Sequence, residues 1–160
     1  MNTKKKIVIL KKKPIANNNN HLAQHICIKA DNLRKLGFSG DLEVWMNDPD
    51  NQYVGRKGRI WITDPVTKTK KIFHYNKDKD TKWGNPYKVA KVGEAPKPNL
   101  NDPVKSTYTL NEALRLYREY LDNSGLINHI NELKGKNLGC FCPQNSPCHA
   151  KILADLANTM

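Results

Sequence analysis

The most regular pattern of apolar and polar positions lies in the last third of the chain. Four apolar residues after position 109 recur at helical spacing: Leu110, Leu114, Tyr117 and Leu121. This spacing predicts a helix to about Asp122, and Thr109 with Glu112 has the form of a capping box at its start. A second helical pattern, over residues 126–133, is followed by Gly135, which is a suitable helix stop.

Residues 137–142 alternate with the period of a strand, which places Leu138, Cys140 and Cys142 on one face. Ser146 and Pro147 then have the chemistry of an N-cap and a first helical position, so they predict the start of a last helix. Its buried side would come from six apolar residues: Ala150, Ile152, Leu153, Ala154, Leu156 and Ala157.

Shorter signals fill the first two thirds of the chain. Apolar runs predict short strands at 7–10, 25–28 and 53–56, and one or two helical turns at 39–46. Residues 59–63 and 70–75 form a predicted hairpin across the turn-like segment 64–67. The polar segment 14–20 indicates a loop, and residues 94–103, which carry three prolines, indicate an extended connector.

Together these elements predict an α/β fold. A chain of 160 residues suits one domain and can bury a core without disulfides. We expect a basic N-terminal strand and Asn-rich loop over 1–25, then a single α/β domain over 26–160 with a hairpin insertion at 57–82. We expect this domain to have a small mixed sheet with the C-terminal helices packed on it, and a ligand site at the strand ends.

The chain is strongly basic, with 27 Lys and Arg against 15 Asp and Glu and a formal net charge of +12. This balance favours a nucleotide or nucleic acid as partner, although a lysine-heavy composition also arises from an AT-rich genome. No apolar run approaches the roughly 20 residues of a membrane span, and the run at 7–10 is too short for a signal peptide. We therefore expect an intracellular protein with no membrane partner.

Three of the four cysteines, Cys140, Cys142 and Cys148, fall within nine positions, and His149 follows directly. One interpretation is a zinc site of these four residues, although their spacings depart from common zinc motifs. A second is a reactive Cys148 thiolate with His149 as its proton-transfer partner, since a helix start lowers the pKa of a cysteine. The third is a set of buried structural thiols in a reducing compartment.

Two further segments carry residue types that bind ligands. In the Tyr-Val-Gly-Arg run at 53–56, Gly55 allows close backbone approach and Arg56 can bind phosphate. In the Trp-Gly-Asn-Pro run at 83–86, Trp83 can stack on a base. Taken singly, a core tryptophan, a simple turn and a surface ion pair explain the same residues.

Taken together, these motifs resemble one family. The residues that carry the resemblance are 48–56, 83–87, 133–142 and 147–149. Over about residues 26–158 the chain is similar to the domain of unknown function 4326 family, found in phages, bacteria and large DNA viruses. The family carries Trp, Phe and Gly where this chain has Phe141, Tyr87 and Ala150. The resemblance implies a shared site but names no activity, and the lysine-rich extension would suit a viral protein.

Our leading expectation is a domain that binds or processes a nucleotide or nucleic-acid component, and whether it is an enzyme stays open. In that expectation Cys148 and His149 carry the chemistry. The ligand-binding residues would be Tyr53, Gly55, Arg56, Trp83, Gly84, Asn85 and Pro86. The alternative is a non-enzymatic, basic nucleic-acid-binding module whose cysteines are structural or hold zinc. The sequence leaves the substrate and the oligomeric state open.

Overall fold

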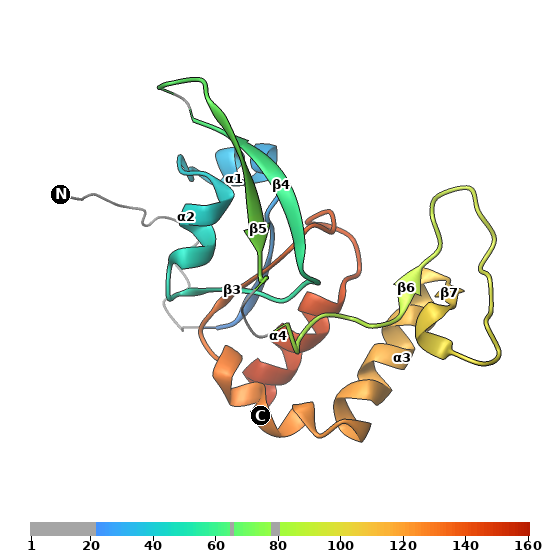
Figure 1. Ribbon diagram of the computed structural model, residues 1–160. Coiled ribbons are helices and arrows are strands. Elements are labelled where there is room, and N and C mark those ends of the chain that lie inside the picture. Colours follow the sequence, from blue (N-terminus) through green and yellow to red (C-terminus); the bar gives the residue numbers. More distant parts are fainter. Residues whose placement is uncertain (1–21, 65, 78–80) are drawn as a thin grey trace.

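A small parallel sheet organises the fold (Figure 1). The computed structural model describes residues 22–64, 66–77 and 81–160, so the strand predicted at 7–10 and the loop predicted at 14–20 lie outside the described residues. The strands pair in the order β2 (Gln24–Cys27), β8 (Asn137–Cys140) and β3 (Asn51–Tyr53). The middle strand, β8, runs parallel to both neighbours. The carboxyl ends of all three strands therefore meet at one edge of the sheet.

Helices cover both faces of this sheet and create two hydrophobic cores. One face carries α3 (Leu110–Asn123), the 3-10 helix η4 (Leu126–Leu133) and α4 (His149–Thr159). The other face carries α1 (Ala30–Lys35) and α2 (Leu42–Asn47). We call these the first and the second core.

Alternation along β8 assigns its side chains to the two cores. Leu138 and Cys140 belong to the first core. Between them, Gly139 faces the second core, where a Cβ atom would lie 2.5 Å from the ring of Trp45 and 2.8 Å from Ile28. The indole ring of Trp45 thus occupies the space that a side chain at position 139 would need.

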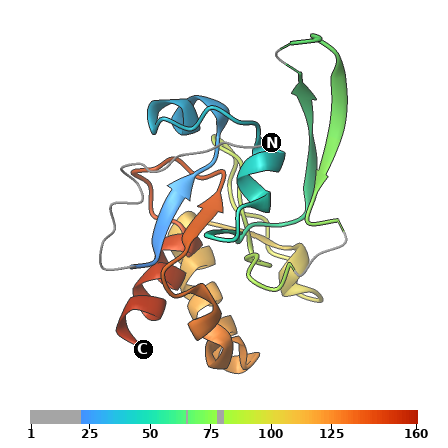
Figure 2. The same ribbon diagram turned by 90° about the vertical axis from the view of Figure 1, so that its left-hand side faces the viewer.

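Two short ribbons extend from this body. In the first, β4 (Gly58–Thr63) and β5 (Lys70–Tyr75) pair in antiparallel, and Figure 2 shows this ribbon projecting away from α3 and α4. In the second, β6 (Lys88–Val89) and β7 (Thr107–Tyr108) pair in parallel. A 3-10 turn, η3 (Pro103–Lys105), ends one residue before β7.

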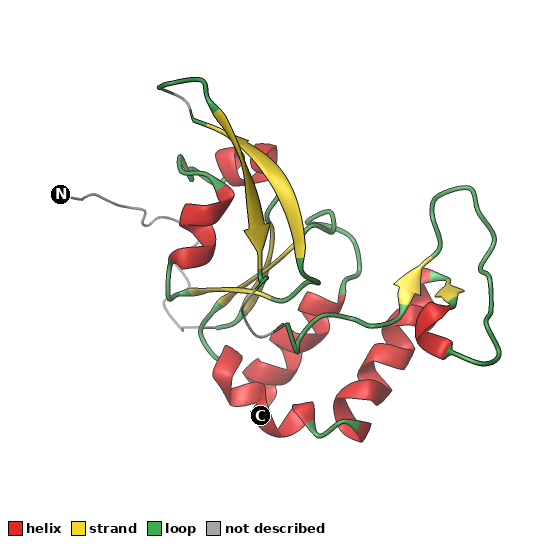
Figure 3. Cartoon of the chain, in the orientation of Figure 1, coloured by secondary structure: helices red, strands yellow, loops and turns green. Residues whose placement is uncertain are grey.

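The predicted α/β class is confirmed, and the C-terminal helices pack on the sheet as expected (Figure 3). The hairpin forms at the predicted residues, and parallel and antiparallel pairings occur in separate sheets. The Thr109 side chain caps α3 by accepting a hydrogen bond from the Glu112 amide at 3.2 Å. Gly135 follows η4 with φ +74°, the left-handed conformation expected of a helix stop.

Three predicted boundaries were wrong, and all three lie at the carboxyl edge of the sheet. β3 ends at Tyr53 and does not reach Arg56, and β8 ends at Cys140. The last helix begins at His149 with Cys148 as its N-cap, because Ser146 is held in a turn by the hydrogen bond from its amide to the Pro143 carbonyl. The sequence patterns also missed α1 and the β6–β7 ribbon. Among the described residues, no helix is long and apolar enough to cross a membrane.

Candidate functional site

The cysteines gather where the parallel strands end. Cys140 is the last residue of β8, and its Sγ lies 3.0 Å from Cys148 Sγ and 3.2 Å from His25 Nε2. The three side chains come from β8, from the start of α4 and from β2, and all three are buried. Their ligand atoms lie within 4.8 Å of one another, so the group could hold a metal ion. We call these three residues together with Cys142 the cysteine cluster.

Cys142 extends this group as a partly buried neighbour that packs against the first core. Hydrogen bonds with the thiols of Cys140 and Cys148 lower the pKa of Cys142. The same interactions, together with burial, raise the pKa of Cys140.

His25 was not among the predicted site residues. Burial, its largest influence, lowers the pKa of the imidazole to about 4, so the ring is neutral near pH 7, which is the form that binds metals. Its Nε2 atom lies 3.2 Å from the Cys140 sulfur, and its Nδ1 atom is buried with no hydrogen-bond partner among the described residues. The one signal in the sequence was a histidine within an apolar strand.

The two ring nitrogens of His149 face different groups. Its Nε2 atom lies 2.7 Å from the Val54 carbonyl, and because a carbonyl only accepts, Nε2 carries the hydrogen. Its Nδ1 atom lies 3.9 Å from Cys148 Sγ, and its ring stands edge-on to Tyr117 at 5.1 Å. Burial lowers the pKa of this histidine. His149 thus fastens α4 to the chain that leaves β3, while His25 lies closer to the Cys140 thiol.

The segments at 53–56 and 83–86 also meet. The Arg56 Nε–H donates to the Asn85 carbonyl at 2.8 Å, and the Tyr53 hydroxyl donates to the Arg56 carbonyl at 2.6 Å. The backbones are close as well, because a Cβ atom on Gly84 would lie 3.1 Å from the Gly55 carbonyl oxygen. The structure therefore brings these two motifs into direct contact.

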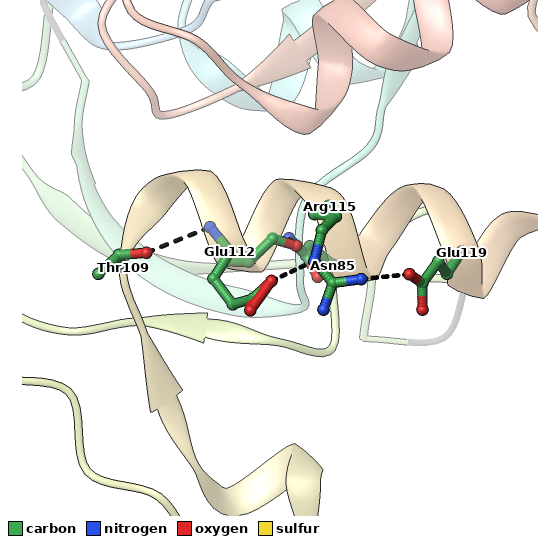
Figure 4. Close-up of polar contacts among 6 residues, drawn as sticks. Asn85, Thr109, Glu112, Arg115 and Glu119 are labelled. Carbon is green, nitrogen blue, oxygen red and sulfur yellow. Dashed lines mark hydrogen bonds and ion pairs between the residues drawn. The ribbon is translucent and has the colours of Figure 1, made fainter.

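Helix α3 supports the Asn85 end of this contact. The Asn85 side chain donates to the Ala113 carbonyl at 3.4 Å and accepts from the Tyr87 amide at 2.9 Å. Figure 4 shows Asn85 beside α3. On the exposed side of that helix, Arg115 pairs with both Glu112 and Glu119.

Four of the predicted ligand-binding residues are buried: Tyr53, Gly55, Trp83 and Asn85. Trp83 is only 3% exposed and belongs to the first core, and its carbonyl accepts a 2.6 Å hydrogen bond from the Tyr117 hydroxyl. Its ring is closed to a base, which corrects the expected stacking role. Tyr53 and Gly55 are buried too, and Gly55 is packed against the Tyr53 ring.

The other motif residues, together with Asn85, line an open cavity of about 520 Å³. Four cationic side chains contribute to its wall: Arg56, Lys57, Lys77 and Lys88. Gly84, Asn85 and Pro86 contribute as well, and none of the lining residues in the described part of the chain is acidic. We call this the cationic cavity.

Asn76 adds an unusual feature to the cationic cavity, which it also lines. It is only 9% exposed and adopts φ +56°, and its Nδ2 amide finds no hydrogen-bond partner in the described parts of the chain. Buried amide groups are nearly always paired in folded proteins. The donor capacity of this amide is therefore unused among the described residues.

The chain is thus an α/β protein with a buried histidine–cysteine group at a parallel sheet edge and a cationic cavity beside it. A family model described as a domain of unknown function (DUF4326) matches residues 41–159. This match spans most of the chain, so the protein belongs to that family, as the motif resemblance indicated. Searches of curated proteins and of solved structures found no match.

Proposed function

We propose that this protein binds the phosphate groups of a nucleotide or nucleic acid in the cationic cavity. The observation that carries the proposal is the joint presence of four cationic side chains and the unpaired Asn76 amide in one hollow. Cations that share a cavity repel one another, and an anion relieves that repulsion. An unpaired buried donor costs about 1–3 kcal/mol, which a ligand oxygen would recover.

The cysteine chemistry supports a binding module more than a thiol enzyme. The Cys148 side chain is 2% exposed, and its sulfur is engaged by Cys140 and by the Ala150 amide. A catalytic thiolate needs access to its substrate and a depressed pKa. The hydrogen bond with Cys140 lowers the pKa of Cys148, but hydrogen bonding to Cys142 and burial outweigh it and raise that pKa to about 12.

We further propose that the cysteine cluster holds a structural zinc ion, with His25, Cys140, Cys142 and Cys148 as ligands. Three sulfurs and one imidazole nitrogen form a common zinc set, and the poorly satisfied His25 ring supports it. Tetrahedral zinc separates two sulfur ligands by roughly 3.8 Å, so the 3.0 Å between Cys140 Sγ and Cys148 Sγ would widen by less than about 1 Å. Such an ion would tie β2, β8 and α4 together.

Metal analysis of the purified protein tests the zinc proposal. We expect one zinc per chain in the wild type and its loss in Cys140→Ser and His25→Ala. Cys27→Ala is the matched control, because Cys27 is a buried cysteine of β2 outside the cluster. A wild type purified in zinc-containing medium without bound metal, or zinc loss in the control, would overturn the assignment.

Phosphate binding is tested by titrating the protein with AMP, inorganic phosphate and a fluorescent oligonucleotide at several salt concentrations. We expect Lys57→Glu and Lys88→Glu each to weaken oligonucleotide binding about tenfold or more and to reduce the salt slope by about 1. Lys134→Glu introduces the same charge change before the amino end of β8, and we expect it to bind like the wild type. Equal losses in all three variants would refute the cavity as the binding site.

A further inference from the structure

The β4–β5 ribbon presents an unusual outer face to solvent. Its register places three pairs side by side: Arg59 with His74, Trp61 with Ile72, and Thr63 with Lys70. Trp61 is 64% exposed and Ile72 is 41% exposed. Large exposed apolar side chains that adjoin one another mark interaction surfaces more often than isolated ones do. We call these six residues the ribbon face.

The opposite side of the ribbon explains why Trp61 is exposed. Strand alternation turns Ile60, Ile62 and Phe73 toward the body, where Ile62 is 7% exposed and the other two pack against the second core. The ribbon is therefore held by its inner side. Trp61 lies on the other side of the ribbon, so the ribbon packs on the body without burying this side chain.

The charge around Trp61 indicates which class of ligand the ribbon face would bind. Arg59 and Lys70 flank the Trp61–Ile72 pair, and none of the six residues of the ribbon face is acidic. An aromatic ring with cations on both sides fits a chain that alternates planar bases with phosphates. In a duplex the base faces are stacked on one another, so only a single strand offers them to an indole ring.

The ribbon face is continuous with the cationic cavity through the chain itself. Lys57 directly precedes β4, while Asn76 and Lys77 directly follow β5, and all three line the cavity. Trp61 lies four positions after Lys57, which is about 13 Å of extended strand. A mononucleotide in the cavity would not reach Trp61, whereas a short oligonucleotide would touch both.

We propose that the ribbon face binds single-stranded nucleic acid, with a base stacked on Trp61 and the neighbouring phosphates led into the cationic cavity. This inference rests on the proposed function, since it names the class of ligand that the cavity accepts. It assigns Trp61 the stacking role that buried Trp83 cannot perform.

Fluorescence anisotropy with a labelled 12-nucleotide single strand tests the proposal, with the matching duplex and AMP as comparison ligands. We expect Trp61→Ala to weaken single-strand binding about tenfold or more, Trp61→Phe to retain most of it, and AMP binding to stay unchanged in both. Val66→Ala is the matched control, because Val66 is an exposed apolar residue at the ribbon tip outside the ribbon face. The wild type should also bind the single strand more tightly than the duplex.

Intrinsic fluorescence gives an independent measurement. Trp45 and Trp83 are each 3% exposed, so a ligand that stacks on tryptophan should quench only Trp61, and Trp61→Phe should lose the quenching. Unchanged single-strand affinity in Trp61→Ala, with the expected loss in Lys57→Glu, would overturn the ribbon proposal and leave the cavity function standing. If neither variant lost affinity, both proposals would fail. Concentration-dependent self-association that Trp61→Ala abolishes, without an effect on the oligonucleotide, would also overturn the ribbon proposal.

Discussion

Replacing Gly55 by alanine tests the packing behind the cationic cavity. A Cβ atom at this position would lie 2.6 Å from Cζ of Tyr53 and would also overlap its hydroxyl oxygen. The backbone of Gly55 is outside the left-handed region, so alanine meets no conformational penalty there. Glycine is required at position 55 because the Tyr53 ring fills the space that a side chain would need. The loss in the free energy of unfolding in Gly55→Ala therefore measures how firmly that ring is held.

Neighbouring aromatic rings leave the Tyr53 ring little room to move. It is 7% exposed and stands edge-on to Tyr75 at 5.3 Å and to Phe141 at 6.1 Å, and its hydroxyl donates to the Arg56 carbonyl. Overpacking of this kind costs about 1–3 kcal/mol, and a displaced hydroxyl forfeits a hydrogen bond of about 1 kcal/mol. We therefore expect Gly55→Ala to lower the free energy of unfolding by about 2–4 kcal/mol. In a chain of this size that corresponds to a fall in Tm of about 5–15 °C.

Thermal and urea unfolding followed by circular dichroism measure this loss. Gly37→Ala is the matched control, because Gly37 has φ +92° and a Cβ atom there would meet nothing within 4 Å. That substitution carries backbone strain of about 1–2 kcal/mol and no steric overlap. A smaller loss for Gly55→Ala than for Gly37→Ala would refute the view that Tyr53 fixes this turn.

Two further substitutions examine the two cores. Tyr117→Phe should lower the free energy of unfolding by about 1–3 kcal/mol, since the buried Trp83 carbonyl loses its hydrogen-bond donor. Tyr108→Phe removes a surface hydrogen bond and should lower the free energy of unfolding by less than half as much. Urea unfolding compares the two, and equal losses would contradict the reasoning. Gly139→Ala should lower the free energy of unfolding by about 1–3 kcal/mol, because the Trp45 ring lies against that position. It should also alter the near-ultraviolet circular dichroism of Trp45. An unchanged spectrum together with unchanged stability would contradict this packing argument.

The sequence pattern was sufficient to predict an element where contacts between residues close in the sequence stabilise it. The start of α3 was predictable because the Thr109 cap acts on an amide three residues away. The hairpin was predictable for the same reason, since its strands are close neighbours in the sequence and alternate cleanly. The α/β class followed from such local signals, without knowledge of how the strands pair.

The cysteine cluster was only partly predictable, because its composition depends on strand order. Cys140 and Cys148 are eight residues apart, but His25 is 115 residues from Cys140 and reaches it only because β2 pairs with β8. The same long-range contacts explain why α4 begins later than the sequence pattern predicted. Cys148 is extended and uses its sulfur as the N-cap, so the helix begins later than Ser146 and Pro147 indicated.

The cationic cavity was less predictable still. Arg56 and Asn85 were chosen as ligand residues from their chemistry, and they do line it. Asn76 and Lys77 went unnoticed because they follow a strand that looked like part of an insertion. Trp61 is exposed because its face of β4 points away from the core, whereas Trp83 is buried although it lies in the segment between β5 and β6. Residue type alone does not reveal this difference.

The two sites are joined by a short and specific path. Cys148 belongs to the cysteine cluster, and the next residue, His149, is hydrogen-bonded to the Val54 carbonyl. Val54 lies two residues before Arg56, whose side chain is hydrogen-bonded in turn to the Asn85 carbonyl. The position of the Arg56 backbone therefore depends on where α4 begins, and α4 begins where the cluster holds the Cys148 sulfur. On this path the cysteine cluster supports one wall of the cationic cavity from behind.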